Sequence, residues 1–463
     1  LRLLGPTTLL QLLILWLHTH SSSAMNNFDL IVVGSGPGGY STAATAASMG
    51  LSVAIIERGE LGGTCLNRGC IPTKALCRCA EVALTVKNAS EFGVKTDNCE
   101  IDYPAMIERK NRIVDQLRQG VKQLLDNVTI VSGEARFEDT DVISVNGDLY
   151  TAPRIIIATG SAPAVLPVPG AELAVNSDYM LSAPALAPSL AIIGGGVIGM
   201  EFALIYSALG VDVTVIEYCK EILPPFDSDI AKRLRMTMKR RGVKFITSAQ
   251  VTSLSKNDDG INIHYMTKGK EGVHTAAVVL MAVGRKPVLP DGLTRLGIKL
   301  RRNAIEVDEN MQTSIPGLYA IGDVNGLCML AHAAEVQGRV ALGIEKMPDI
   351  IPSAVFTVPE CAMAGITEQQ CIDRAIPYAT AQSTFHANGK ALAMGEPDGM
   401  VKVIVNSETK AIIGVHICGA HAADLIQEAV MAMAAGFTAA QAGEAVHGHP
   451  TLSEALLSAY RRF

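Results

Sequence analysis

Two cysteines, Cys65 and Cys70, lie five positions apart in the run Gly-Gly-Thr-Cys-Leu-Asn-Arg-Gly-Cys at 62–70. In a regular helix this separation places the two Cα atoms about 7.5 Å apart along the axis, beyond the roughly 4.4 to 6.8 Å that a disulfide spans. A bridge therefore requires a loop or a distorted helix, and Gly69 permits such a distortion. The alternatives are a metal site or two unrelated thiols, but metal ligands usually have two or three intervening residues and a second pair nearby, which this region lacks. We interpret the pair as a redox disulfide.

The two sulfurs are predicted to differ in chemistry. Pro72 is well suited to the first turn of a helix that we expect from Pro72 to about Val86. Cys70 then lies at the positive end of that helix, where a thiolate is stabilised. Cys70 is therefore the better candidate for a persistent thiolate.

A glycine-rich pattern occurs twice at a constant offset of 160 residues. The first copy is a strand at 30–33, the glycine loop 34–39, a helix to Gly50 and a strand at 52–56 that ends at Glu57. The second copy spans 190–217. The matched pairs are Gly34 and Gly194, Gly36 and Gly196, Gly39 and Gly199, Gly50 and Gly210, and Glu57 and Glu217.

Each copy has the context of a dinucleotide-binding unit. A lone glycine pattern is weak evidence, but here each lies between a strand and a helix, with an acid 18 residues after its last glycine. The glycines allow the backbone to approach a pyrophosphate at the helix N-terminus, and Glu57 and Glu217 can each accept a hydrogen bond from a ribose hydroxyl. Two such sites predict electron transfer between two nucleotides.

The remaining elements complete an α/β fold class with two Rossmann-like domains and an α+β C-terminal domain. Met431 and Met433 are expected to pack in a core or an interface. The supporting segments are strands ending in glycine turns at 155–160 and 279–284, a strand with a terminal acid at 318–323, strands at 400–405 and 411–417, and helices from about Ala422.

Composition narrows the possible functions. The chain of 463 residues is 49% hydrophobic and 18% charged, and its net charge of −6 argues against nucleic-acid binding as a main activity. The basic run 239–241 is expected to end a helix that opens near Asp227 or Asp229. Ten cysteines without a secreted-type framework favour a reducing compartment, and we expect a cytoplasmic location.

The first 24 residues differ from the rest. Arg2, an apolar stretch at 9–17 and Ser22-Ser23-Ala24 are similar to a signal peptide, and the stretch is too short to span a membrane. Because Met25 leads directly into a strand, we expect it to be the natural start and residues 1–24 to be an artefactual extension. Export stays open as the alternative.

Together these motifs make the chain resemble the flavoprotein disulfide reductases, and within them most closely the dihydrolipoamide dehydrogenases. The resemblance covers essentially all of residues 25–463. Its motifs, in order after the first glycine loop, are GGTCLNRGCIPTKAL, ATGSAP, GGGVIGMEFA, AVGRKP, GLYAIGDV, LAHAAEVQG and HGHPTLSE.

The resemblance implies the cofactors and the residue roles. In the family Cys70 is the sulfur beside the flavin, Cys65 exchanges with substrate, and Lys74 pairs with Glu201 near the reactive flavin nitrogen. The implied FAD-binding residues are Gly34, Gly36, Gly39, Glu57, Lys74, Gly160, Asp323 and Ala331, and the implied NAD-binding residues are Gly194, Gly196, Gly199, Glu217 and Gly284.

The terminal motif at 447–454 has two readings. Thr451-x-x-Glu454 is also a helix capping box, so from the residues alone Glu454 is as well explained by structure as by catalysis. The resemblance implies that His449 is the acid/base and that Glu454 orients its imidazole. His447 matches a position that is often histidine in the family, but a packing role explains it at least as well. In the family the histidine serves the disulfide of the second subunit, which implies a homodimer.

The resemblance also implies domains, partners and rivals. The expected segments are 25–150 (FAD domain, first part), 151–281 (NAD domain), 282–346 (FAD and central, second part) and 347–463 (dimerisation). The implied partner is a lipoyl-bearing acyltransferase or a glycine-cleavage H protein. The resemblance implies no metal site in this chain. The alternatives are a glutathione-type reductase using NADP, which Glu217 disfavours by repelling a 2′-phosphate, and a mainly docking role. Arg68, where many relatives carry valine, either lowers a thiol pKa or simply faces solvent.

Overall fold

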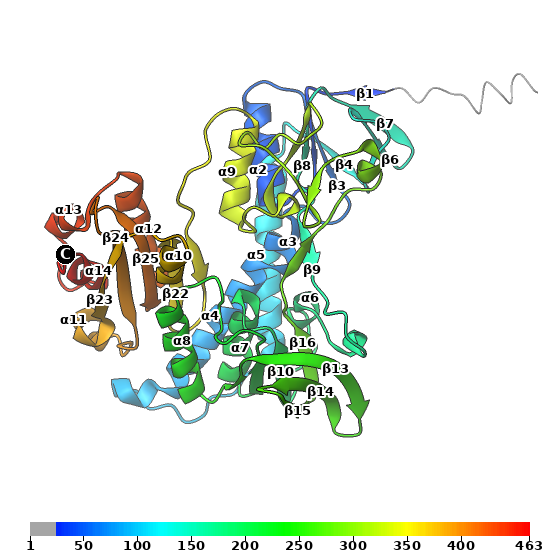
Figure 1. Cartoon of the computed structure of the whole chain (residues 1–463). Helices are drawn as coiled ribbons and strands as arrows, with labels where there is room; N and C mark the ends of the chain where they lie inside the picture. Colours follow the sequence, from blue (N-terminus) through cyan, green and yellow to red (C-terminus); the bar gives the residue numbers. More distant parts are fainter. Residues whose placement is uncertain (1–24) are drawn as a thin grey trace, which may run out of the picture. The chain divides into compact units, whose positions relative to one another are not determined.

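The computed structural model describes residues 25–463, and the predictions made for residues 1–24 lie outside them (Figure 1). The chain divides into two compact units. Among the described residues, the first unit comprises 25–61, Val121–Gly160 and Pro287–Lys346, and the second comprises Gly62–Gly120, Ser161–Lys286 and Met347–Phe463.

The first unit is built on a five-stranded parallel sheet in the order β20-β8-β2-β3-β4. Its central strand is fully buried and entirely apolar, as expected for a strand covered on both faces. Helices α2 and α9 pack together, with Gly338 close to Thr42 and Gly38 close to Ala334. The strands are β20 (Leu318–Ala320), β8 (Ile155–Ile157), β2 (Leu30–Val33), β3 (Val53–Glu57) and β4 (Thr129–Ser132), and the helices are α2 (Pro37–Ser48) and α9 (Ala331–Ala341).

A smaller sheet and short turns complete the first unit. The sheet has the order β1-β7-β6-β5, and β18 pairs with β19 in a short hairpin. These elements are β1 (Asn26–Asn27), β5 (Arg136–Phe137), β6 (Val142–Val145), β7 (Asp148–Thr151), β18 (Leu300–Arg301), β19 (Ala304–Ile305), η3 (Leu293–Leu296) and η4 (Gly322–Asn325).

The second unit contains a second parallel sheet, in the order β12-β11-β10-β16, with helix α7 packed on β10 and β11. An antiparallel sheet, β13-β14-β15, follows in the chain. The elements are β10 (Ser189–Ile193), α7 (Val197–Ala208), β11 (Asp212–Ile216), α8 (Ser228–Arg240), β12 (Lys244–Ile246), β13 (Ala249–Asn257), β14 (Gly260–Thr267), β15 (Lys270–Ala276) and β16 (Val278–Met281), preceded by η2 (Ala171–Leu173) and α6 (Ser177–Met180). Strands β9 (Ser161–Pro163) and β17 (Arg285–Pro287) pair with each other.

The cysteine pair lies on helical segments of the second unit. Helix α3 (Gly63–Arg68) ends at Gly69, and α4 (Cys70–Lys87) begins at the next residue. The predicted helix is confirmed, although it starts two residues earlier than Pro72. The turn η1 (Ala89–Phe92) and helix α5 (Tyr103–Leu124) follow.

The C-terminal part of the second unit is an antiparallel sheet in the order β21-β22-β25-β24-β23, drawn in yellow to orange in Figure 1. Alternate residues such as Val401 and Val403 pack with helices α12 and α14, while Lys402 contacts Asp227 at the start of α8. The elements are β21 (Ser353–Val355), β22 (Glu360–Gly365), α10 (Glu368–Asp373), β23 (Tyr378–Thr384), η5 (Phe385–Ala387), α11 (Gly389–Ala393), β24 (Met400–Asn406), β25 (Ile412–Gly419), α12 (Ala422–Ala434), α13 (Ala439–Glu444) and α14 (Glu454–Tyr460).

This architecture confirms the predicted fold class of two Rossmann-like units and an α+β C-terminal region. The basic run ends α8, whose first residue follows the capping side chain of Asp227. Met433 is buried in the C-terminal core, whereas Met431 is 73% exposed. Among residues 25–463, none of the helices is both long and apolar enough to cross a membrane.

Candidate active site

The redox pair lies at the junction of α3 and α4, with Cys65 inside α3 and Cys70 as the first residue of α4. Gly69 makes this junction possible, because a Cβ added there would lie 2.8 Å from the carbonyl oxygen of Thr64 and 3.2 Å from the Cα atom of Cys65. Only glycine allows the chain to turn back this closely over the preceding helix. Both cysteines are free in the structure.

The protein polarises the two sulfurs in opposite directions. The hydrogen bond from Cys65, supported by the positive charge of Lys74, lowers the pKa of the Cys70 thiol to about 7. The same hydrogen bond, together with burial, raises the pKa of Cys65 far above its ordinary value. Cys70 is also at the N-terminal end of α4, where the helix dipole favours an anion. The arrangement holds one thiolate and one thiol near neutral pH.

Lys74 lies one turn after Cys70 and is held by Glu201 of helix α7. The Lys74 ammonium donates to both carboxylate oxygens, at 2.9 and 3.1 Å, which confirms the predicted pairing. Burial opposes the charge of Lys74, but the combined effect of Glu201 and Cys70 outweighs burial and raises the pKa of the lysine. Phe356, just after strand β21, donates its backbone N–H to Glu201 at 3.1 Å, and its ring lies 4.7 Å from the lysine nitrogen.

Phe356 belongs to no motif, so sequence reasoning missed it. It fixes the Lys74–Glu201 pair from 155 residues away in the chain, and only the folded sheet reveals this contact. Arg68 is exposed, in agreement with the alternative that its side chain simply faces solvent. The charged side chains that act on Cys70 are Lys74 and Glu201.

His449 and Glu454 form a second chemical centre within the second unit. Glu454 accepts from the His449 ring at Nδ1 (2.9 Å) with one oxygen and from the Thr451 backbone N–H (2.8 Å) with the other. Helix α14 begins at Glu454 itself with Ser453 as its N-cap, so Thr451 does not cap the helix, although its backbone N–H donates to Glu454 as it would in a capping box. His449 is highly exposed, with 81% of its side chain accessible. The pairing predicted from the motif is confirmed, and the catalytic roles stay predictions.

His447 is held separately. Its Nε2 lies 3.0 Å from a carboxylate oxygen of Glu428 on α12, and its Nδ1 lies 3.0 Å from the Ala445 carbonyl oxygen. Only 8% of this side chain is accessible. The contacts fit the packing role considered for His447.

The 160-residue repeat is reproduced in three dimensions. Helices α2 and α7 begin and end at positions 160 apart. Gly34 and Gly194 have φ of 103° and 107°, and a Cβ on Gly39 or Gly199 would lie 1.9 or 2.0 Å from their carbonyl oxygens. Glycine is therefore required at these turns.

The two acids of the repeat, Glu57 and Glu217, accept hydrogen bonds from corresponding backbone N–H groups. In the first unit, Glu57 accepts from the backbone N–H groups of Ser35 (2.9 Å) and Gly59 (2.7 Å). In the second, Glu217 accepts from the corresponding groups, those of Gly195 (2.5 Å) and Cys219 (2.6 Å). Each carboxylate thus stands beside its glycine loop, which fits a ribose-binding position.

Both glycine loops fit a bound dinucleotide. Helices α2 and α7 have Gly36 and Gly196 as their N-cap residues, with no side-chain cap and no acidic residue in the first turn. A Cβ on either glycine would meet nothing within 4 Å, so the space outside each loop is open. Uncapped N–H groups beside open space are suited to a pyrophosphate.

The other predicted FAD residues lie at ends of elements in the first unit. Because strands β20, β8, β2 and β3 are parallel, their carboxyl ends share one sheet edge. Glu57 ends β3, Gly160 follows β8 with φ of 68°, and Asp323 follows β20 in η4. Ala331 is the first residue of α9. In the second unit Gly284 follows β16 in the same manner, with φ of 107°.

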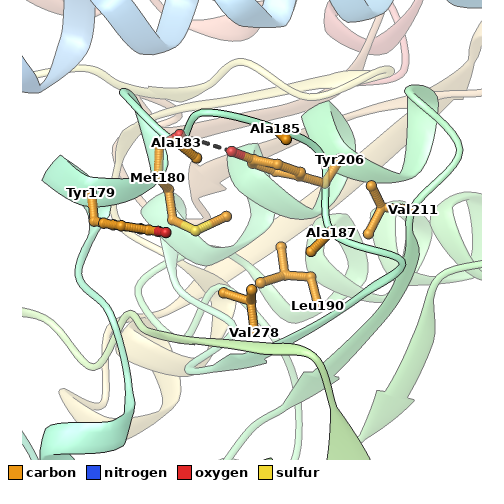
Figure 2. Close-up of a pocket in the computed structure, with 9 residues that line it drawn as sticks. All are labelled: Tyr179, Met180, Ala183, Ala185, Ala187, Leu190, Tyr206, Val211 and Val278. Atoms are coloured by element: carbon orange, nitrogen blue, oxygen red, sulfur yellow. Dashed lines mark hydrogen bonds between the residues drawn. The ribbon is translucent and has the colours of Figure 1, made fainter. Parts of the chain in front are cut away.

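A small pocket in the second unit lies away from these centres. It is lined by apolar side chains and by Tyr179 and Tyr206, and the Tyr206 hydroxyl donates to the Met180 carbonyl oxygen at 2.8 Å (Figure 2). None of the predicted site residues lines it. The chemistry of the site therefore does not depend on this pocket.

Comparison with known proteins places these centres in a family. The model of the pyridine nucleotide-disulphide oxidoreductases matches residues 28–338, and that of the family's dimerisation domain matches residues 351–460. The chain belongs to this family. Membership makes it an oxidoreductase that uses FAD and NAD, and the C-terminal match supports a homodimer.

Individual relatives agree with the family assignment. The dihydrolipoyl dehydrogenase of Geobacillus stearothermophilus is 40% identical over 446 residues, covering 93% of this chain and 95% of its own. That of Thermus scotoductus is 40% identical over 450 residues, covering 94% and 97%. Among solved structures, the HOCl-induced flavoprotein disulfide reductase RclA of Escherichia coli superposes with a TM-score of 0.83 at 27% identity, covering 94% of this chain and 99% of that one.

Proposed function

We propose that this chain is a dihydrolipoyl dehydrogenase, which oxidises protein-bound dihydrolipoyl groups to lipoyl groups with NAD⁺. The observation that carries the proposal is the polarised pair Cys65 and Cys70, with a thiolate stabilised at Cys70 by the neighbouring thiol and Lys74. The relatives bearing this enzyme's name, at 34 to 40% identity, support the choice of substrate.

The nucleotide assignments form part of the proposal. The glycine loop at 34–39 with Glu57, Gly160, Asp323 and Ala331 would hold FAD, and the loop at 194–199 with Glu217 and Gly284 would hold NAD. When bound, the flavin accepts an electron pair from the dithiol and passes it to NAD⁺ as hydride. Glu217, fixed by two backbone N–H groups, favours NAD over NADP because its charge repels a 2′-phosphate.

The chain's own residues account for the thiol chemistry. His449 accepts a proton at Nε2 from one dihydrolipoyl thiol, since Glu454 holds Nδ1. The new thiolate attacks the Cys65 sulfur of the oxidised pair, the disulfide bond breaks, and Cys70 leaves as the thiolate. The second dihydrolipoyl thiol then attacks the mixed disulfide and closes the lipoyl ring. As the second thiol attacks, Cys65 leaves with one proton relayed by His449 and the other proton stays on His449, so the cysteine pair has gained two electrons.

The role of Cys70 as leaving group follows from its environment. A sulfur with a lower pKa leaves faster in thiol–disulfide exchange. The pKa of Cys70 is about 7, whereas that of Cys65 is raised, so attack at Cys65 expels the better leaving group. The exposed His449 side chain is proposed to serve a second copy of the chain, in keeping with the matched dimerisation domain.

The proposal extends to assembly and location. The substrate group would be a lipoyl-lysine on an acyltransferase or a glycine-cleavage H protein. A cytoplasmic location is in keeping with ten cysteines that, outside the redox pair, show no secreted-type framework. The domain segments 25–150, 151–281, 282–346 and 347–463 are retained as part of the proposal.

Substitution of one sulfur tests the function. We expect Cys65→Ser to reduce NADH formation from free dihydrolipoamide and NAD⁺ to background while the flavin stays bound, because the interchange sulfur is lost. The matched control is Cys99→Ser, at an exposed cysteine outside the pair, which should retain wild-type turnover. Full activity of Cys65→Ser would refute the proposed mechanism.

A further inference from the structure

The segment that carries Cys65 is poorly stabilised by itself. Helix α3 has six residues, and Leu66 is its only buried residue. A single helical turn and a half gains too few hydrogen bonds to be stable in isolation. The position of Cys65 relative to Cys70 must therefore be maintained by contacts from outside α3.

Arg118 of helix α5 supplies such a contact through Asn67. Its Nε and one terminal nitrogen donate to the Asn67 side-chain oxygen, at 3.0 and 2.9 Å. The Asn67 amide nitrogen in turn donates to the Gly63 carbonyl oxygen at 3.0 Å. Because a guanidinium only donates and a carbonyl only accepts, one orientation of the Asn67 amide satisfies both contacts.

Helix α5 is a firm support for this contact. Tyr103 at its start is buried in the largest core cluster of the second unit, and Lys110 donates to the Leu181 carbonyl oxygen at 2.8 Å while only 6% exposed. Arg118 itself is partly covered, with 31% of its side chain accessible, and Asp115 lies 3.1 Å away. The chain of contacts runs from α5, which is anchored in the core at Tyr103 and Lys110, through Arg118 and Asn67 to the first turn of α3.

We propose that Arg118 is a positioning residue of the redox centre, which fixes α3 through Asn67 and thereby sets how closely Cys65 approaches Cys70. The contact matters to chemistry because Cys65 donates the hydrogen bond that stabilises the Cys70 thiolate. Arg118 acts through Asn67 and α3 rather than by its charge. The groups that act on Cys70 directly are Cys65 on α3, Lys74 on α4 and Glu201 on α7.

The inference rests on the proposed function only for the redox use of the pair, and its test needs no turnover. Reduced full-length protein is alkylated with iodoacetamide from pH 5 to 9, and the modified Cys70 peptide is followed by mass spectrometry. Arg118→Ala should move the midpoint of the alkylation rate to higher pH by about half a unit or more, a roughly threefold loss of rate at pH 6.5. Arg112→Ala is the matched control, since Arg112 lies on the same helix and pairs only locally with the exposed Glu108.

Two further variants separate positioning from misfolding. Arg118→Lys keeps the charge but cannot place two donors on one oxygen, so it should show part of the same shift. Asn67→Ala should reproduce the shift, and the double variant should add nothing to it, because both single changes remove the same link. An unchanged midpoint in folded Arg118→Ala or Arg118→Lys, or an additive double variant, would overturn the proposal. Failure of the dihydrolipoamide assay alone would leave these alkylation results standing.

Discussion

Cys65 and Cys70 are near neighbours in the chain, yet the protein gives them opposite acid–base behaviour. Cys70 begins a helix and faces Lys74, whereas Cys65 lies in the preceding helix and donates a hydrogen bond to Cys70. This difference in pKa suits the proposed chemistry, in which Cys65 is the sulfur that is attacked and Cys70 is the sulfur that leaves. The asymmetry predicted from Pro72 and the helix dipole is reinforced by Lys74, whose contribution the spacing of the cysteines does not reveal.

Replacing Lys74 tests the electrostatic part of this asymmetry. Lys74→Met removes the positive charge that favours the Cys70 thiolate, so the thiolate should form only at higher pH. We expect the pH midpoint of iodoacetamide alkylation to rise by about one unit from its value near 7. Lys87→Met, at the other end of the same helix, should leave the midpoint unchanged. A lower or unchanged midpoint in Lys74→Met would show that the lysine does not stabilise the thiolate.

Glu454 is expected to act through His449. Glu454→Gln removes the negative charge that holds Nδ1 and favours proton uptake at Nε2, so kcat with dihydrolipoamide should fall by about 10- to 100-fold. Steady-state kinetics and a thermal unfolding curve measured together separate catalysis from folding. Glu444→Gln, at the end of α13, is the control and should keep wild-type kcat. Wild-type kcat in Glu454→Gln would reduce this carboxylate to a structural role.

At the scale of elements, the two strand–glycine loop–helix units were predictable because their glycines are required by the local backbone conformation of each turn. A backbone carbonyl oxygen lies within 2.0 Å of where a Cβ on Gly39 or Gly199 would be placed. Only glycine fits at these positions, so the glycines in the sequence predict the tight turn. The strand after each loop was placed to within a residue or two. The α3–α4 junction was harder, because the break at Gly69 depends on the close passage of Thr64 and not on any regular pattern.

The buried lysine of strand β24 shows what sequence patterns miss. Lys402 is 1% exposed and donates to Asp227 (3.0 Å), Asp229 (2.8 Å) and Glu368 (2.5 Å). Its neighbours in the strand are apolar, and its partners lie 34 to 175 residues away in the chain. No pattern of neighbouring residues therefore predicts that Lys402 pairs with these three carboxylates.

This network should contribute strongly to stability. Lys402→Met leaves three carboxylates close together, with Asp227 only 1% exposed, and should destabilise the second unit by about 3 to 5 kcal/mol. Glu134→Ala, which breaks the exposed pair with Arg58, should cost less than about 1 kcal/mol. Urea unfolding followed by circular dichroism compares the two. Equal midpoints for both variants would contradict the importance assigned to the buried network.

At the scale of the whole molecule, the chain combines two nucleotide-binding folds, a redox pair and a histidine–carboxylate pair. The sequence predicted each of these components, since each is encoded by residues close together in the chain. The contacts of Phe356 with Glu201 and of Arg118 with Asn67 were not predictable, because Phe356 and Arg118 belong to no motif and lie far along the chain from their partners. Substrate choice belongs to this scale, since it depends on the redox pair, the base and the nucleotide site acting together.

The most direct test of this account is the steady-state rate of purified protein in two reactions. One is NADH formation from dihydrolipoamide and NAD⁺, and the other is NADPH consumption with glutathione disulfide. The account predicts rapid turnover in the first reaction and only background in the second, because Glu217 is held beside the second glycine loop. Faster turnover with NADPH and glutathione disulfide would contradict it.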